Sequence, residues 1–137
     1  MKVAKVGAQV AILGIGSLFV ACSAHAMDLT GLWATGTEAC DKIFETKENR
    51  VAFRRDSDMH GSGFIVEGRR IRGGTANCTV TKSKEDNDII HMIASCATDI
   101  MYSNVQFSVK VLGEDKIIRF FPGIEGMELM YYRCPSR

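Results

Sequence analysis

The sequence predicts an all-β domain, built either as a small antiparallel β-barrel or as a sandwich of eight or nine short strands, with two disulfides. Three observations indicate this fold class: polar and apolar residues alternate in several short runs, turn-forming residues separate these runs roughly every 10–12 positions, and four cysteines follow an export signal. No window carries apolar residues at helical spacing for three turns, so we expect little helix. A barrel also removes the unpaired edges that a small sheet otherwise has to protect.

The expected strands follow one another through most of the chain. Residues 104–111 alternate polar and apolar side chains without exception, which indicates one buried face and one face in water. Residues 89–96 contain few polar side chains, so we expect that strand to be buried on both faces. In chain order the expected strands are residues 29–34, 51–54, 64–66, 69–71, 75–82, 89–96, 104–111, 117–121 and 129–134.

Charged or glycine-containing turns separate these strands. Glu67-Gly68 is a hairpin candidate between two short strands, and residues 84–88 form a charged turn. Residues 113–115 supply another turn, and Pro122-Gly123 ends the strand that follows it. Turns this short predict antiparallel pairing between neighbouring strands.

Residues 1–26 have the features of a secretory signal peptide. Two lysines make a basic start, residues 6–21 are uncharged and mostly apolar, and Ala24-His25-Ala26 provides a small-residue cleavage site. The apolar run is shorter than the roughly 20 residues that a membrane span needs. We therefore expect cleavage after Ala26 and a single disulfide-stapled β domain over residues 27–137.

A second interpretation of the export signal places a lipid anchor at Cys22. Leu18-Phe19-Val20-Ala21-Cys22 resembles a bacterial lipoprotein box, in which the cysteine is lipidated and becomes the first residue. Phe19 stands where that box usually has Leu, Val or Ile, so cleavage after Ala26 is favoured.

Composition and charge exclude several classes of protein. Of the 137 residues, 46% are hydrophobic and 24% are charged, which excludes a disordered or collagen-like chain. Without residues 1–26, which contain two lysines and no acidic residue, the net charge changes from +1 to −1. A near-neutral chain has no overall field to attract nucleic acid or an anionic membrane. We expect a periplasmic or secreted protein with no nucleic-acid partner and no transmembrane span in its mature form.

Four cysteines remain after the signal peptide, and an even number in a small exported chain predicts two disulfides. Their spacings lack the close C-x-x-C pair typical of zinc sites. If a turn centres near Asn87, Cys78 and Cys96 lie opposite each other on adjacent antiparallel strands. Closing a barrel brings the first and last strands together, so Cys40 is expected to pair with Cys134.

A glycine and a tryptophan open the first expected strand as Gly31-Leu32-Trp33, and Arg133 lies in the last strand. Arginine stacks well on an indole face. This pattern resembles the G-x-W opening of lipocalins and related barrels. The resemblance implies a lipocalin-like barrel in which Trp33 plugs one end and Arg133 packs over it.

Two further resemblances concern small exported domains. Small bacterial metalloproteinase inhibitors are periplasmic barrels with a similar G-x-W opening and a disulfide, and they inhibit through an N-terminal segment, whereas here only Met27-Asp28 would precede the first strand. The chain also resembles small secreted proteins of alphaproteobacteria, which implies a periplasmic domain of that type and no particular activity. The matching residues are Ala39-Cys40-Asp41-Lys42, Gly61-Ser62-Gly63-Phe64, Ile71-Arg72-Gly73 and Tyr132-Arg133-Cys134-Pro135.

Asp56, Asp58 and Glu67 form a candidate calcium loop. Their spacing, with Gly61 between them, nearly matches an EF-hand, in which carboxylates surround a hard cation. However, His60 replaces an oxygen ligand, and strands rather than helices flank the loop. A solvated acidic turn is therefore the favoured interpretation, and no metal or other cofactor is expected.

Candidate catalytic residues are few. His60-Gly61-Ser62-Gly63 lacks the first glycine of the G-x-S-x-G elbow, because Met59 stands at that place. The mature chain has two histidines, His60 and His91, and His91 lies in a very apolar strand. No base and nucleophile can be paired from the sequence, so we expect no enzyme.

Five arginines form a candidate partner-binding patch. They come from two expected strands that we place side by side, and arginine forks suit carboxylates and phosphates. Acidic residues nearby in the sequence offer the alternative of a solvated, salt-bridged face. The five are Arg54, Arg55, Arg69, Arg70 and Arg72.

Together these observations favour a non-catalytic binding protein of the cell envelope, which binds either a small apolar ligand inside the barrel or a protein partner on its surface. The first alternative is a periplasmic proteinase inhibitor, with residues 103–104 or 124–127 as the loops that would enter an active site. The second is an enzyme of unknown type. A ligand carrier needs a cavity, whereas side chains fill many small barrels, here Phe44, Phe53, Phe64, Phe107 and Met92.

Overall fold

The computed structural model describes residues 27–136. The predicted signal peptide and the alternative lipid attachment at Cys22 lie outside the described residues. In order, the described elements are β1 (Gly31–Ala34), the 3-10 helix η1 (Thr37–Ala39), α1 (Cys40–Ile43), β2 (Phe44–Lys47), β3 (Arg50–Phe53), the 3-10 helix η2 (Ser57–His60), β4 (Gly63–Glu67), β5 (Arg70–Gly73), β6 (Asn77–Asp86), β7 (Ile89–Ala97), β8 (Tyr102–Val111), β9 (Lys116–Phe120) and β10 (Leu129–Cys134). None of the helices within residues 27–136 has the length and apolar character of a membrane-spanning segment.

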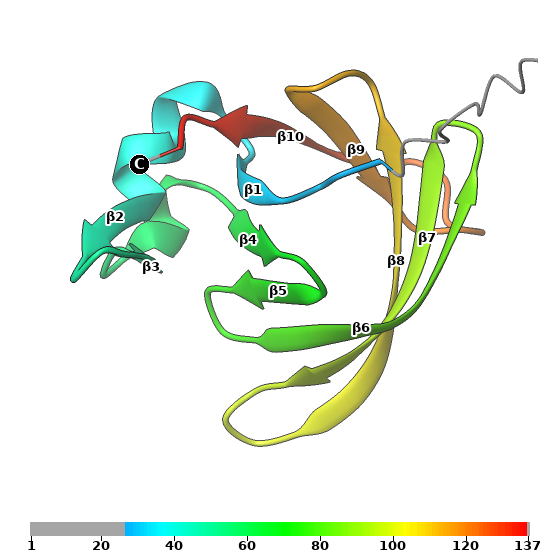
Figure 1. Cartoon of the computed structure of the whole chain (residues 1–137), viewed down its shortest axis with the longest axis horizontal. Coiled ribbons are helices and arrows are strands. Elements are labelled where there is room, and N and C mark those ends of the chain that lie inside the picture. Colours follow the sequence, from blue (N-terminus) through cyan, green and yellow to red (C-terminus); the bar gives the residue numbers. More distant parts are fainter. Residues whose placement is uncertain (1–26, 137) are drawn as a thin grey trace, which may run out of the picture.

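Eight of these strands close into a barrel in the order β1-β10-β9-β8-β7-β6-β5-β4, and β4 pairs again with β1. Every pairing in the barrel is antiparallel. Figure 1 shows the long, bent strands β6, β7 and β8 on one side and the short strands β4 and β5 on another. The predicted all-β fold is confirmed, and of the two predicted alternatives the structure is a barrel and not a sandwich.

The two longest runs of the sequence form strands with different outcomes. On β8 the inner face is as predicted, since Val105, Phe107 and Val109 face the interior, and Gln106 on the other face is exposed. Ser108 on that other face is fully buried, so the prediction that the whole outer face meets water is wrong there. On β7 the expected burial of both faces is wrong: every second residue is buried, but Ile93 is 44% exposed. The outer face of this part of the barrel meets solvent, so only the inner face has to be apolar.

The segment between β1 and β4 leaves the barrel. β2 and β3 pair with each other as a separate two-stranded sheet, and Figure 1 shows them with α1 to one side of the barrel. The strand predicted over residues 51–54 therefore forms, but it is not a barrel strand, and its partner β2 was not predicted. The sequence pattern identified a strand without revealing where it pairs.

Two clusters of buried side chains result. The inner core lies inside the barrel and contains Trp33, Val66, Cys78, Val80, Ile90, Met92, Ala94, Cys96, Val109, Ile117 and Tyr131. The outer core lies between the barrel wall and the segment that leaves it, and it contains Leu32, Ala34, Ala39, Cys40, Ile43, Phe44, Ile65 and Cys134. Successive residues of β1 alternate between the two clusters, as a strand with two buried faces requires.

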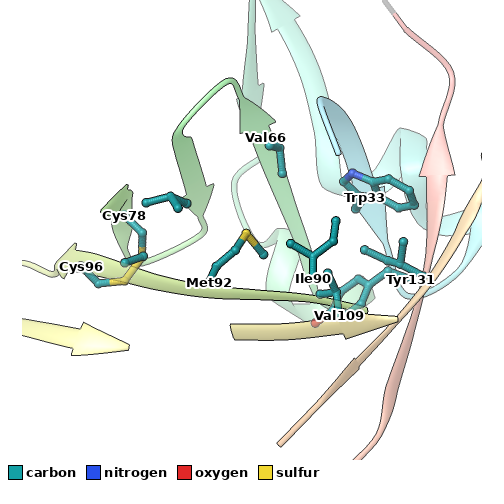
Figure 2. Close-up of a cluster of buried hydrophobic side chains, with 11 residues drawn as sticks. Trp33, Val66, Cys78, Ile90, Met92, Cys96, Val109 and Tyr131 are labelled. Carbon is teal, nitrogen blue, oxygen red and sulfur yellow. A yellow bond between two sulfur atoms is a disulfide. The ribbon is translucent and has the colours of Figure 1, made fainter. Parts of the chain in front are cut away.

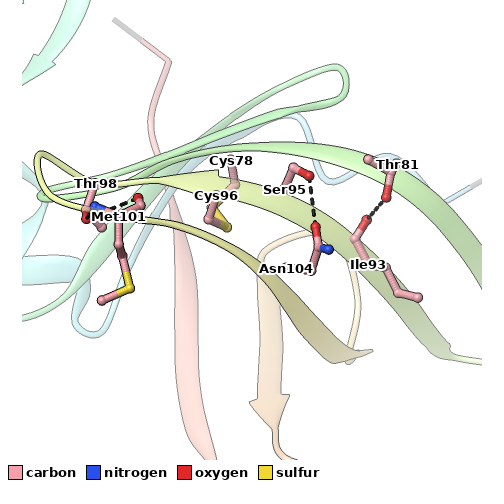
Figure 3. Close-up of a disulfide and its surroundings, with 8 residues drawn as sticks. All are labelled: Cys78, Thr81, Ile93, Ser95, Cys96, Thr98, Met101 and Asn104. Carbon is pink, nitrogen blue, oxygen red and sulfur yellow. Dashed lines mark hydrogen bonds between the residues drawn. A yellow bond between two sulfur atoms is a disulfide. The ribbon is translucent and has the colours of Figure 1, made fainter.

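Both predicted disulfides are confirmed. Cys40 in α1 bonds to Cys134 in β10, 94 residues apart, and Cys78 bonds to Cys96 directly across β6 and β7. Figure 3 shows the surroundings of the second disulfide, where the Ser95 hydroxyl donates to Asn104 Oδ1 at 2.9 Å. The first disulfide fastens the outer segment to the last strand, and the second joins two neighbouring strands of the barrel wall.

Candidate functional site

The barrel encloses a cavity of about 560 Å³. This volume falls within the roughly 300–1,000 Å³ typical of small-molecule sites. Figure 2 shows the inward side chains, with the Cys78–Cys96 disulfide and Trp33 on either side of Met92 and Ile90. Most of the wall is apolar and includes Phe64, Val66, Ile71, Cys78, Val80, Ile90, Met92, Cys96, Val105, Phe107 and Val109.

Of the two alternatives left open by the sequence, a ligand cavity or an interior filled by five large side chains, the structure has the cavity. Phe44 and Phe53 belong to the outer core and its margin, where their ring centroids lie 5.3 Å apart. They cannot enter the barrel because β2 and β3 lie outside it. The other three, Phe64, Phe107 and Met92, line the cavity and leave the space between them open.

One end of the barrel is closed by Trp33 and Arg133. The indole of Trp33 is fully buried, and its Nε1–H donates to the Leu29 carbonyl at 2.8 Å. The guanidinium carbon of Arg133 lies 4.3 Å from the centroid of the Trp33 ring. The two residues that the sequence was expected to bring together at one end of the barrel are therefore in contact.

Arg133 also ties three separate parts of the chain together. Its Nε donates to the Glu114 carbonyl at 2.6 Å, and its two Nη groups donate to the carbonyls of Thr30 and Asp28. Each of these bonds is charge-assisted, which makes it stronger than a neutral hydrogen bond. Arg133 therefore holds the β8–β9 turn and residues 28–30 against the end of the barrel.

The glycine of the Gly31-Leu32-Trp33 motif is required by the same arrangement. Gly31 has φ +140°, and a Cβ atom there would lie 2.8 Å from Nη1 of Arg133. A side chain would thus displace the guanidinium as well as strain the backbone. The glycine of the motif is therefore needed because Arg133 approaches the first strand so closely.

Residues 27–30 lie across this closed end. Met27 and Leu29 pack against the inner core, and the Met27 amide donates to Glu85 Oε1 at 3.2 Å. Hydrogen bonds from Thr30 hold the pKa of the Asp28 carboxyl below its usual value, and the charge of Arg133 lowers that pKa further. A segment that inhibits a proteinase would need to extend into it, whereas residues 27–30 are bonded to their own barrel.

Arg119 is a cavity residue that the sequence reasoning missed. It follows Ile117 by two positions on β9, so both side chains point inward, and it lines the cavity. Its guanidinium carbon lies 4.7 Å from the Phe107 ring centroid and 4.9 Å from that of Phe121. The signal was present in the sequence, because Arg119 is the one charged residue in the apolar run over residues 117–121.

The five arginines of the candidate patch do not form one free surface. Arg54 and Arg55 follow β3, which pairs with β2 and not with β5, the strand that carries Arg70 and Arg72. Arg69 donates to the carbonyls of Val80 and Thr81. Arg72 donates to the Val51 carbonyl and to the Glu67 carboxylate. Arg54 donates to the Phe44 carbonyl and forms an ion pair with Glu45. Arg55 and Arg70 are exposed.

Among residues 27–136 no group of three or more His, Cys, Asp or Glu side chains is placed to hold a metal ion. Asp56 immediately precedes η2 and Asp58 lies within it. Glu67 is the last residue of β4, and its carboxylate forms an ion pair with Arg72 at 3.0 Å. The three carboxylates of the candidate calcium loop are therefore not brought together, because β4 carries Glu67 into a hairpin where Arg72 is its counter-ion.

Within residues 27–136 the histidines and serines do not assemble an accessible catalytic pair. His60 is exposed in η2, while Ser62 Oγ lies 3.3 Å from the hydroxyl of Tyr131. His91 Nδ1 lies 2.9 Å from Ser108 Oγ, but Ser108 is fully buried. A substrate cannot reach a hydroxyl in that position, so the pair satisfies a buried polar group.

The two loops named for a proteinase inhibitor also differ. Ser103 and Asn104 lie within β8 and pair with β7, so they are not a loop and that expectation is wrong. Residues 124–127 do connect β9 to β10, and Ile124 and Met127 are 53% and 51% exposed.

No protein-family model, curated protein or solved structure matches the chain.

Proposed function

We propose that this is an exported, non-catalytic binding protein of the cell envelope that holds a small apolar ligand inside its barrel. The carrying observation is the cavity of about 560 Å³ with a mostly apolar wall. An apolar ligand would remove from water the half-buried side chains of that wall, at roughly 25 cal/mol per Å² of apolar surface. Export to the periplasm or beyond is part of the proposal, and two disulfides are compatible with an oxidising compartment.

A ligand in the barrel is favoured over a protein partner on the arginine surface. Three of the five arginines donate to backbone carbonyls of their own chain, so binding a partner through them would first break those bonds. The cavity requires no such rearrangement. The proteinase-inhibitor alternative keeps one exposed loop, residues 124–127. For the enzyme alternative, the His91–Ser108 pair is buried at Ser108.

The test is a titration of the disulfide-bonded protein with Nile red, a neutral dye whose emission rises in apolar surroundings. The decisive variant is Val105→Phe, which adds a ring to the cavity wall, and its matched control is Gln106→Phe on the exposed face of the same strand. We expect saturable binding, weakened about tenfold or more by Val105→Phe and unchanged by Gln106→Phe.

Two results would count against the proposal. One is the absence of saturable binding by the wild-type protein. The other is equal binding by both variants, which would place the dye on the outer surface. Circular dichroism and the urea midpoint of each variant show whether it is folded.

A further inference from the structure

We propose that the ligand is a single-chain amphiphile with a carboxylate head, and that Arg119 binds this carboxylate while the apolar chain occupies the cavity. The proposal rests on the proposed function, since it specifies the ligand of the same cavity. The evidence for it is the Arg119 side chain, which, unlike the other charged side chains that line the cavity, has a buried nitrogen without a hydrogen-bond partner.

Arg119 faces the cavity because of its position on β9. Ile117 on the same face is fully buried in the inner core, and the neighbour of Arg119 across β8 is the inner-core residue Val109. On the other side its partner is Leu129, which lies four residues before Arg133 on β10. Arg119 is thus set back along the strands from the closed end and nearer to the β9–β10 connection.

The guanidinium of Arg119 lacks an anionic partner. Its Nε is buried and has no hydrogen-bond partner, and none of the ion pairs found within residues 27–136 includes it. The rings of Phe107 and Phe121 contact it instead. A buried donor without an acceptor is unfavourable, and the buried Nε therefore marks a position that an anion would stabilise.

The other charged side chains of the cavity wall already have partners. Arg69 donates to two backbone carbonyls, Asp28 accepts from the Thr30 amide, and Glu85 accepts from the Met27 amide. An incoming anion would have to break those bonds, whereas at Arg119 it would break none. We therefore place the carboxylate head group of the ligand at Arg119.

The rest of the wall decides what is attached to the head group. Around Arg119 the inward side chains of β7 and β8 are apolar, including Ile90, Met92, Val105 and Val109. A small polar anion would leave these side chains in contact with water, whereas an alkyl chain would cover them. A planar carboxylate matches the fork of an arginine, with two parallel hydrogen bonds available.

The experiment compares two ligands of equal chain length by their displacement of Nile red from the disulfide-bonded protein. Dodecanoate carries the carboxylate, and dodecanol lacks it. The variants are Arg119→Gln, which removes the charge from the cavity wall, and Arg70→Gln, which removes an exposed arginine outside that wall. We expect the wild-type protein and Arg70→Gln to bind dodecanoate about tenfold or more tightly than dodecanol, as a charge-assisted hydrogen-bond pair predicts.

In Arg119→Gln the preference for dodecanoate should fall to about twofold or less, while the affinity for dodecanol stays that of the wild type. Unchanged dodecanol binding shows that the cavity is intact, which a purely structural role for Arg119 would not predict. Equal binding of both ligands by the wild type, or an undiminished preference in Arg119→Gln, would overturn this inference and leave the proposed function standing. If neither ligand nor Nile red binds the wild type, the proposed function fails and the inference fails with it.

Discussion

The inner core and the outer core are both apolar and both contain a disulfide, yet they are packed differently. In the outer core Ala34, Ile43 and Phe44 are at most 1% exposed, and no wall of the barrel cavity is built from them. The inner core surrounds a cavity, and half-buried side chains such as Phe64 and Phe107 line it. One cluster is arranged to fill space, and the other to enclose it.

The difference teaches how a small barrel can remain closed around an open interior. The outer core takes its barrel residues from β1, β4 and β10, the three strands that meet where the barrel closes. Packing on the outside therefore stabilises that junction without occupying the inside. Residues 35–62, which form no barrel strand, serve the barrel as an external support.

The largest expected effect separates the two disulfides. Removing Cys40–Cys134 with a double alanine variant should lower the free energy of unfolding by about 4–5 kcal/mol, because it opens a long loop, whereas removing Cys78–Cys96 should cost about 3 kcal/mol. Urea denaturation of both double variants measures the two losses. The reverse order would contradict the dependence of each loss on the length of the loop that the disulfide closes.

Two phenylalanines test the packing difference directly. Phe44→Ala in the outer core should cost about 3–5 kcal/mol, since the ring is fully buried and its removal leaves a hole. Phe107→Ala should cost about 1–2 kcal/mol, since its ring is only partly buried and already borders a cavity. Urea midpoints with a common slope give both values, and equal losses would contradict the contrast between a filled and an enclosing core.

The smallest effect is pH-dependent and compares the closed end with the outer hairpin. The pKa of Asp28 is lowered by hydrogen bonds from Thr30, and that of Glu45 by its ion pair with Lys47. Each ionised carboxylate therefore stabilises the fold above the unfolded-state pKa, and this contribution is lost as the pH falls through the lowered folded-state value. Both groups are near the surface, so each effect is small.

The check compares Asp28→Asn and Glu45→Gln with the wild type in urea from neutral to acidic pH. Each variant should be slightly less stable at neutral pH and should converge on the wild type in acid. For Glu45→Gln the difference should shrink in high salt, which screens an exposed ion pair. A gap that widens in acid would contradict the direction of both pKa shifts.

The parts of the fold that could be predicted are those specified by local pattern. The strict alternation over residues 104–111 identifies β8, and the charged turn around Asn87 places Cys78 opposite Cys96. These features depend on period and turn position alone. The hairpin β2–β3 was missed as a unit because a strand pattern does not say which sheet the strand joins, and tertiary packing decides that.

The cavity and Arg119 lay beyond prediction for a different reason. Whether inward side chains fill a barrel depends on its strand number and stagger, which are properties of the closed sheet. Phe44 and Phe53 cannot fill it, because β2 and β3 lie outside the barrel. Arg119 needed the register with Val109 and Leu129 before its direction was known.

The way the first strand is secured has a consequence for the order of folding. β1 obtains its two neighbours from β4 and from β10, and Arg133 and Cys134 come from the end of the described chain. Contacts between distant parts of a chain form slowly, because a long loop must close before they stabilise anything. We expect the hairpins from β4 to β9 to form first as an open sheet. The first strand of the barrel in sequence order is then the last to be locked in place, when β10 pairs with it.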